Sequence, residues 1–192
     1  MGAIFQSLGR TVLAGFVLLI LLIVLAGNIT MGHAWGTFVV RWLHVLCGIM
    51  WIGLLYYFNF VQIPSMPKIP DEQKPAIGKV IAPTALFWFR WAALATVVTG
   101  LLVAFMSGYL ASALGLQKPF TAIGIGMWIA LVMAFNVWFI IWPNQKKALG
   151  IVIVEAAEKA KAARLAMLTS RANTMLSIPM LYCMVAQQNG GL

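Results

Sequence analysis

Long apolar runs alternate with short polar segments along the whole chain. Each run is long enough to cross a hydrocarbon core of ~30 Å at a rise of ~1.5 Å per helical residue. The pattern predicts membrane-spanning helices at residues 11–27, 35–61, 91–114, 120–142 and 165–186. We therefore expect an all-α fold, an integral membrane bundle of about five helices that forms a single transmembrane domain over residues 1–192.

The segments between the runs carry the helix-breaking and charged residues. Residues 63–75 contain four prolines and several charges, which predicts a loop, and Pro143 predicts the end of the fourth span. Residues 147–164 are rich in alanine, with Glu155 and Lys159 at i,i+4 spacing, and predict a cytoplasmic amphipathic helix that continues into the fifth span.

Composition supports the membrane assignment. Hydrophobic residues make up 62% of the chain and charged residues 9%, with a mean hydropathy of +0.95. A soluble domain is roughly half apolar and a quarter charged. The net charge of +9 comes from basic residues that lie mostly in the segments between spans, so we expect no nucleic-acid partner.

The distribution of basic residues predicts the orientation. With the N-terminus in the cytoplasm, only Arg41 and Lys118 of the 13 lysines and arginines fall on the opposite side. Cytoplasmic segments of membrane proteins carry the excess of positive charge. We therefore expect a multi-pass protein of the bacterial cytoplasmic (inner) membrane with a periplasmic C-terminus.

The second span carries the candidate chemistry, in the stretch RWLHVLCGIMWIG at residues 41–53. Steps of three and four residues place Arg41, His44, Gly48 and Trp51 on one side of a helix. Polar side chains are costly in a membrane, so they usually face the protein interior and often mark a site.

The residues of this span leave three interpretations open. In the first, the His44 imidazole binds the iron of haem b, Gly48 lets the porphyrin approach the backbone, and Arg41 meets a propionate. The second is a metal or proton site. In the third, His44 forms a hydrogen bond with a neighbouring helix and Arg41 extends toward the interface.

Other ligands and catalytic groups are sparse. His33 is a weak candidate for a second iron ligand, because it lies about 16 Å from His44 along an unbroken helix. The two cysteines, Cys47 and Cys183, form no CxxCH motif, which excludes a c-type haem in these residues. No predicted span contains a carboxylate, so we name no catalytic residue.

Several stretches resemble one family. RWLHVLCGIMWIG with the following YYFNFVQIP, then FRWAALATVVTG, NVWFIIWPNQKK and SRANTMLSIPML, resemble the membrane domain of bacterial cytochrome-c-linked urate hydroxylases, the urate oxidase N-terminal family. Together they cover roughly residues 38–184. More loosely, the His44 helix is similar to that of the membrane protoporphyrinogen oxidases and of copper-resistance membrane proteins. The resemblance implies a b-type haem with His44 as an axial ligand.

These observations lead to one expected function and two alternatives. We expect a small haem-b-binding subunit for electron transfer, accessory to a larger membrane complex. Its expected partners are other membrane protein subunits and lipid, with a periplasmic electron carrier as a further candidate. The alternatives are a cofactor-free structural subunit that scaffolds a membrane complex and a free-standing membrane oxidase.

Overall fold

A computed structural model describes residues 2–27 and 31–191 of the chain. The regular elements in these ranges are helices, which confirms the predicted all-α class. The chain divides into two compact units, Met1–Phe38 and Val39–Leu192, each described by itself. The single transmembrane domain stays a prediction. The first unit contains α1 (Gly2–Phe5), α2 (Leu8–Ala26) and the start of α3 (His33–Tyr56).

Within the described ranges, four helices are long and apolar enough to cross a membrane. They are Leu8–Leu25, His33–Lys68, Lys74–Met106 and Thr121–Ala148, and they correspond to the first four predicted spans. The fifth predicted span lies in α10 (Ala156–Asn189), which is long enough but less apolar and is not among the four. Its crossing, and the orientation of the whole chain, stay predictions.

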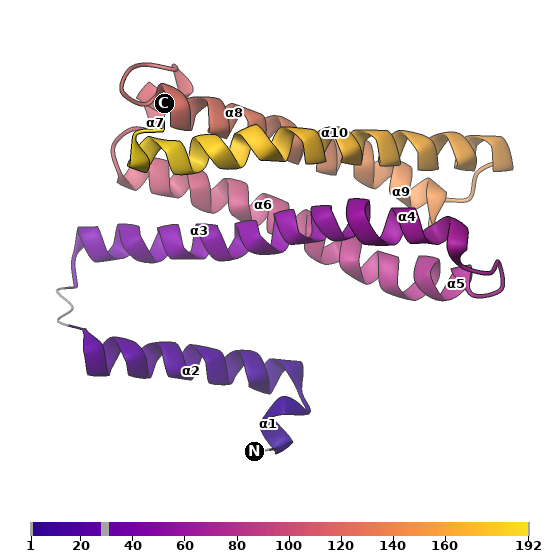
Figure 1. Ribbon diagram of the computed structural model, residues 1–192, viewed down its shortest axis with the longest axis horizontal. Helices are drawn as coiled ribbons and strands as arrows, with labels where there is room; N and C mark the ends of the chain where they lie inside the picture. Colours follow the sequence, from indigo (N-terminus) through magenta and orange to yellow (C-terminus); the bar gives the residue numbers. More distant parts are fainter. Residues whose placement is uncertain (1, 28–30, 192) are drawn as a thin grey trace. The chain divides into compact units, whose positions relative to one another are not determined.

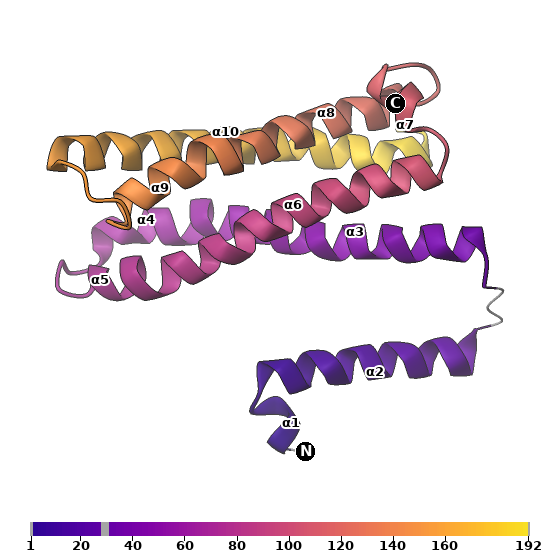
Figure 2. The ribbon, with the colours of Figure 1, turned by 180° about the vertical axis from the view of Figure 1, so that it is seen from behind.

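The second unit is a bundle in which α3, α6, α8 and α10 run side by side (Figures 1 and 2). Its main apolar core joins residues of all four helical paths, among them Trp51, Leu55, Phe89, Met133 and Met180. The remaining elements are η1 (Tyr57–Gln62), α4 (Ile63–Ser65), η2 (Met66–Lys68), α5 (Lys74–Ala76), η3 (Ile77–Ile81), α6 (Ala82–Met106), α7 (Leu110–Leu114), α8 (Thr121–Phe135), η4 (Asn136–Ile141) and α9 (Trp142–Ala148).

Three helical paths pass through prolines, and the sequence analysis took those at Pro64 and Pro143 as breaks. The π-helical segments η1, η3 and η4 each end two residues before a proline, at Pro64, Pro83 and Pro143. A proline clashes with the carbonyl four residues earlier and has no N–H to donate, and a wider π turn relieves that conflict. The predicted loop at 63–75 is therefore helical through Lys68, and the predicted stop at Pro143 is wrong, because α9 continues to Ala148.

Glycines with positive φ set two helix ends that the sequence analysis misplaced. Gly150, with φ of 74°, follows α9, so residues 149–155 are not part of the helix predicted at 147–164, and α10 begins at Ala156. From there α10 does continue without a break through residues 165–186. Gly108, with φ of 76°, follows α6, which ends at Met106 while the predicted span ran to residue 114.

The buried face of α10 is made of small and polar side chains at steps of three and four residues: Ala162, Ala166, Ser170, Asn173, Ser177, Met180, Cys183 and Ala186. Small side chains let helices approach closely, and polar ones join them by hydrogen bonds. The Asn59 amide donates to Ser170 Oγ at 2.8 Å, and Tyr56 and Ser177 share a hydrogen bond of 3.0 Å. These bonds explain why a helix with so many polar residues packs in the bundle.

Asn173 is the centre of this network, and its loss is expected to destabilise the bundle. Its side chain is fully buried, accepts from Asn136 Nδ2 at 2.8 Å and donates to the Met133 carbonyl at 3.0 Å. Asn173→Ala removes both hydrogen bonds and leaves the Asn136 amide without this acceptor, which is expected to lower the free energy of unfolding by about 1–2 kcal/mol. Unfolding in mixed micelles with increasing SDS measures this change.

Asn144→Ala is the matched control, because the Asn144 amide bonds only to the Ile140 carbonyl of its own helical path. An equal loss in the two variants would contradict the role assigned to Asn173.

Candidate functional site

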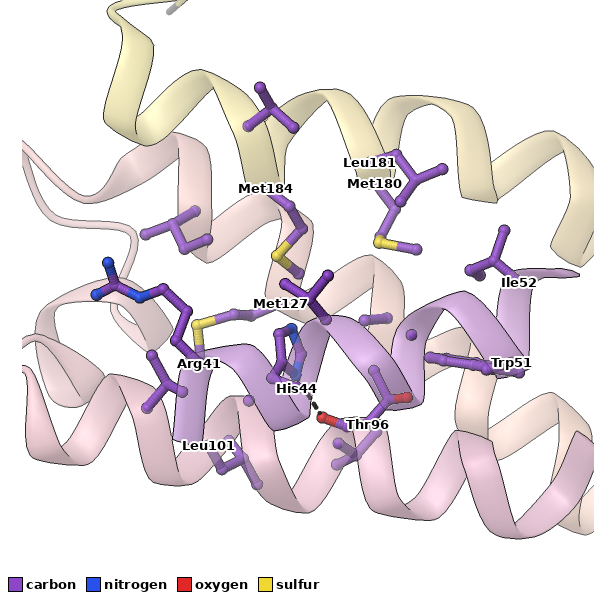
Figure 3. Close-up of a pocket in the computed structure, with 18 of the residues that line it drawn as sticks. Arg41, His44, Trp51, Ile52, Thr96, Leu101, Met127, Met180, Leu181 and Met184 are labelled. Carbon is purple, nitrogen blue, oxygen red and sulfur yellow. Dashed lines mark hydrogen bonds between the residues drawn. The ribbon is translucent and has the colours of Figure 1, made fainter. Parts of the chain in front are cut away.

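A cavity of about 590 Å³ opens between the helices of the second unit. Its walls come from α3, α6, α8 and α10, with Tyr109 from the segment after α6 (Figure 3). Pockets for small ligands and cofactors are typically ~300–1,000 Å³ and mostly apolar. The cavity is therefore large enough for a cofactor.

The lining changes in character along the cavity. Most of the wall is aliphatic, and the side chains of Met127, Met180 and Met184 extend into it from α8 and α10 (Figure 3). Besides His44 and Thr96, four further polar residues line it: Arg41, Tyr109, Gln188 and Asn189. They lie in the early part of α3, just after α6 and at the end of α10, which meet at one end of the bundle (Figure 1). The cavity suits a ligand with a large apolar body and a polar edge.

The imidazole of His44 is held in one orientation. Its Nδ1 lies 2.9 Å from the Thr96 carbonyl oxygen. A carbonyl can only accept, so Nδ1 carries the proton and donates, and Nε2 keeps its lone pair. The Thr99 hydroxyl is 3.3 Å from the same nitrogen but already donates to the Ala95 carbonyl at 2.6 Å.

The lone pair on Nε2 has no hydrogen-bond partner in residues 2–27 and 31–191. Histidines that bind a metal almost always donate their other N–H to a carbonyl or carboxylate, which fixes the tautomer. The hydrogen bond to a neighbouring helix that one interpretation predicted does exist, but it uses only one ring nitrogen. The other remains available to a ligand in the cavity.

Gly100 provides the surface on which the imidazole lies. A Cβ built at Gly100 would be 2.8 Å from His44 Cε1 and 3.1 Å from Nδ1, closer than non-bonded carbon atoms approach. Only a residue without a side chain therefore allows His44 to reach the Thr96 carbonyl. The sequence analysis selected neither Thr96 nor Gly100 as a site residue.

The positive charge of Arg41 acts on the phenol of Tyr109. Burial raises the pKa of the Tyr109 phenol, and the positive charge of Arg41 opposes that rise. Arg41 has no carboxylate partner among the residues that the structure describes. The arginine can therefore pair with an anionic group of a ligand.

Gly48 and Trp51 complete the α3 wall of the cavity. A Cβ at Gly48 would meet only Thr96 Cγ2, at 3.9 Å, so the backbone there is open to a ligand. Trp51 is 1% exposed, and its indole N–H is buried with no partner in the described part of the chain. All four site residues predicted from helical spacing therefore line one cavity.

His33 does not join this site. It begins α3, which is one uninterrupted helix through His44, so the two side chains are separated by about 16 Å along the axis. His33 is not among the residues that line the cavity. The role of His33 as a second iron ligand stays a prediction.

Several lining residues were missed by sequence reasoning. Tyr109, Gln188 and Asn189 lie outside the second span, and nothing in their local sequence distinguishes them from ordinary interfacial residues. The three methionines gave a weak signal only, because methionine is a common filler of membrane cores. Thr96 and Gly100 give the third span a small, polar face. Such a face is a sequence signal that another helix packs closely there.

Comparison with known proteins bears on only part of the cavity. No curated protein and no solved structure matches the chain. A family model matches residues 103–190, a shorter range than the resemblance over residues 38–184 predicted. The matched range leaves out Arg41, His44, Gly48 and Trp51. It includes the end of α6, Tyr109, α8 and α10. Over residues 103–190, the chain is similar to the family described as Urate oxidase N-terminal.

Proposed function

We propose that the cavity binds haem b and that the protein is a small redox subunit of a bacterial inner-membrane complex. The observation that carries the proposal is the tautomer of His44, whose protonated Nδ1 donates to Thr96 and whose Nε2 is free toward the cavity. This nitrogen is the atom of His44 that would hold a haem iron. When bound, haem supplies one-electron transfer.

The residues around His44 fit this group in three further respects. The apolar walls suit a porphyrin, and the cavity volume of about 590 Å³ lies in the range of cofactor pockets. Gly48 leaves the backbone of α3 open. Arg41 lies beside Tyr109 among the polar lining residues, where it would pair with a propionate carboxylate.

The chain's own residues would hold and tune the redox site. Thr96 keeps the imidazole in the binding tautomer, and Gly100 gives it room. The aliphatic wall and the methionines exclude water, which together with the axial ligand sets a haem potential. With the predicted orientation, Arg41 lies near the periplasmic surface, so a periplasmic electron carrier is the expected exchange partner and the membrane complex the other.

The spectrum of the purified wild-type protein tests the proposal. We expect a Soret band and an α-band in the reduced-minus-oxidised difference spectrum, and haem that acidified acetone extracts because no cysteine binds it covalently. A pyridine haemochrome assay should give about one haem per chain, the number that one His44 site allows. A colourless, folded protein after expression with added haem precursor would contradict the proposal and favour a cofactor-free scaffold.

Gly100→Ala tests the position of the His44 imidazole without removing the nitrogen proposed to bind haem. The new methyl group would lie 2.8 Å from His44 Cε1, so the ring must leave the Thr96 carbonyl. We expect haem affinity to fall about 10- to 100-fold, the range for loss of a partner that orients a metal-binding histidine. Haem titration of the apoprotein, followed at the Soret band, measures the change.

Gly78→Ala serves as the control, since a Cβ there would meet only Leu149 Cδ2 at 4.0 Å and Gly78 does not line the cavity. Unchanged affinity in Gly100→Ala, with a normal fold, would argue against the assigned orientation of His44.

A further inference from the structure

Arg90 is a buried cation in a part of the second unit that the proposed redox site does not use. The side chain lies in α6, inside a candidate membrane span, and is 9% exposed. Its guanidinium carbon lies 3.3 Å from the centre of the Trp142 ring. A cation–π contact of this kind offsets part of the cost of removing a charge from water, but it satisfies no N–H donor.

The hydrogen-bonding capacity of Arg90 is unmet. Its Nη1 is buried without a partner, and no side-chain hydrogen bond or ion pair joins Arg90 to another residue of the described ranges. A guanidinium has five N–H donors and stays protonated, so it cannot escape this cost by losing its charge. None of the four acidic residues of the chain, Asp71, Glu72, Glu155 and Glu158, lies in the candidate spans. The described residues therefore supply no acceptor for this N–H, and a ligand at the protein surface could supply one.

A second cation lies at the same ring. Lys146 Nζ is 5.7 Å from the centre of the Trp142 ring, and Lys146 is half-buried in α9. Two positive groups within reach of one indole, with no carboxylate between them, make a local field that favours an anion. The planar fork of an arginine fits the oxygen atoms of a phosphate in a bidentate manner.

The depth of Arg90 in the span indicates where such an anion comes from. Arg90 lies 16 residues before Met106, the end of its helical span, which corresponds to about 24 Å of a hydrocarbon core that is ~30 Å thick. Half-exposed Trp88 and Trp91 flank it in sequence, and Trp91 contacts Trp138 edge to face. Tryptophans gather at the depth of the lipid headgroups. Arg90 is therefore within reach of a lipid phosphate.

From these contacts we infer that Arg90, Trp142 and Lys146 form a binding site for the phosphate of a membrane phospholipid. Phosphate oxygens accept from the Arg90 guanidinium, and Lys146 adds a second positive charge. The acyl chains of the lipid lie along the exposed apolar surface beside this site. The inference does not depend on the proposed haem, because it concerns different residues and a different ligand.

Lipid binding to the full-length protein tests the inference. Protein stripped of lipid by detergent exchange is titrated with phosphatidylglycerol and, separately, with diacylglycerol of the same acyl chains, and bound lipid is counted by native mass spectrometry. We expect phosphatidylglycerol to bind the wild type with a measurable affinity and diacylglycerol to bind far more weakly. Arg90→Met should weaken phosphatidylglycerol binding about 10- to 100-fold, as expected for loss of charge-assisted hydrogen bonds.

Two further variants keep the result interpretable. Arg171→Met removes an exposed arginine of α10 and should change phosphatidylglycerol binding less than about twofold, since exposed single charges contribute little. Arg90→Lys keeps both charges at Trp142 and loses only the guanidinium fork, and Lys146→Ala keeps the guanidinium. Both should give smaller losses than Arg90→Met, and they replace it if that variant does not fold.

Two results would overturn the inference. One is phosphatidylglycerol binding that is the same in the wild type and in Arg90→Met, Arg90→Lys and Lys146→Ala. The other is complete displacement of the lipid by excess inorganic phosphate, which would show that the site takes the free anion and not a lipid.

Discussion

Replacing His44 with alanine is expected to remove haem from the purified protein almost completely. Loss of a residue that only orients a metal-binding histidine typically lowers affinity ~10- to 100-fold, and loss of the ligand itself should exceed that range. The fold should survive, because the imidazole is half-buried and makes its hydrogen bonds only to Thr96 and Thr99. The measurement is the Soret absorbance per protein after purification.

Added imidazole provides a direct test of the assigned role. In His44→Ala the space of the lost ring remains open to the cavity, and free imidazole can enter it and offer the same nitrogen to haem. We expect millimolar imidazole to restore part of the b-type spectrum in this variant and to leave the wild type unchanged. Rescue of this kind separates a lost ligand from a damaged fold.

His33→Ala is the matched control, since His33 does not line the cavity. It should retain the wild-type Soret absorbance. Equal haem content in the wild type and in His44→Ala would end the assignment of His44 as the ligand. Loss of haem in His33→Ala alone would point to the other histidine of the chain.

Helical periodicity was enough to predict one wall of the candidate site. Steps of three and four residues from Arg41 through Trp51 hold in α3, and all four predicted residues line one cavity. What periodicity cannot predict is the partner atom. The hydrogen bond that fixes His44 goes to a backbone carbonyl 52 residues away. Every residue has a backbone carbonyl, so the sequence cannot show which one accepts this bond.

The helix boundaries were least predictable at the prolines. Local rules treat Pro64 and Pro143 as breaks, because each lacks an N–H and clashes with an earlier carbonyl. The bundle carries both within continuous helical paths by widening the preceding turns into π helices. Asn59 and Asn136 form hydrogen bonds from these paths to α10, and such tertiary contacts stabilise an unbroken helix. A rule based on local sequence does not include contacts of this kind.

Hydropathy alone is a poor guide to the place of α10, for a related physical reason. Ser170, Asn173 and Ser177 lower its apolar character, yet all three are buried and hydrogen-bonded to other helices or to their own. A polar residue that is paired inside a bundle does not face lipid. Its contribution to a hydropathy sum therefore says little about whether the helix belongs inside the membrane.

Gly124→Ala is expected to cause a large loss of stability. Gly124 is the glycine of the second unit at which an added Cβ would come closest to another helix. A Cβ at Gly124 would lie 2.1 Å from the Ala113 carbonyl oxygen and 3.0 Å from its carbonyl carbon. Those atoms belong to the backbone of α7 and cannot rotate away. Overpacking usually destabilises by about 1–3 kcal/mol, and a clash with backbone should reach the upper end of that range.

The clash should also reach the cavity, because the residue that precedes α7 and residues of α8 line it. Tyr109 precedes α7, Ile123 precedes Gly124, and both line the cavity. Displacement of α7 in Gly124→Ala should therefore lower haem retention together with stability, whereas Gly100→Ala should lower haem retention with little change in the fold. SDS-induced unfolding and Soret absorbance, measured on the same samples, distinguish the two.

Gly53→Ala is the control for Gly124→Ala, since a Cβ at Gly53 would meet nothing within 4 Å. Alanine is a better helix former than glycine by about 0.5–1 kcal/mol, so this variant should be at least as stable as the wild type. If Gly124→Ala were equally stable, α7 would have to be free to move away from α8. Tyr109 would then not be held at the cavity, and the polar end of its lining would lose one of its groups.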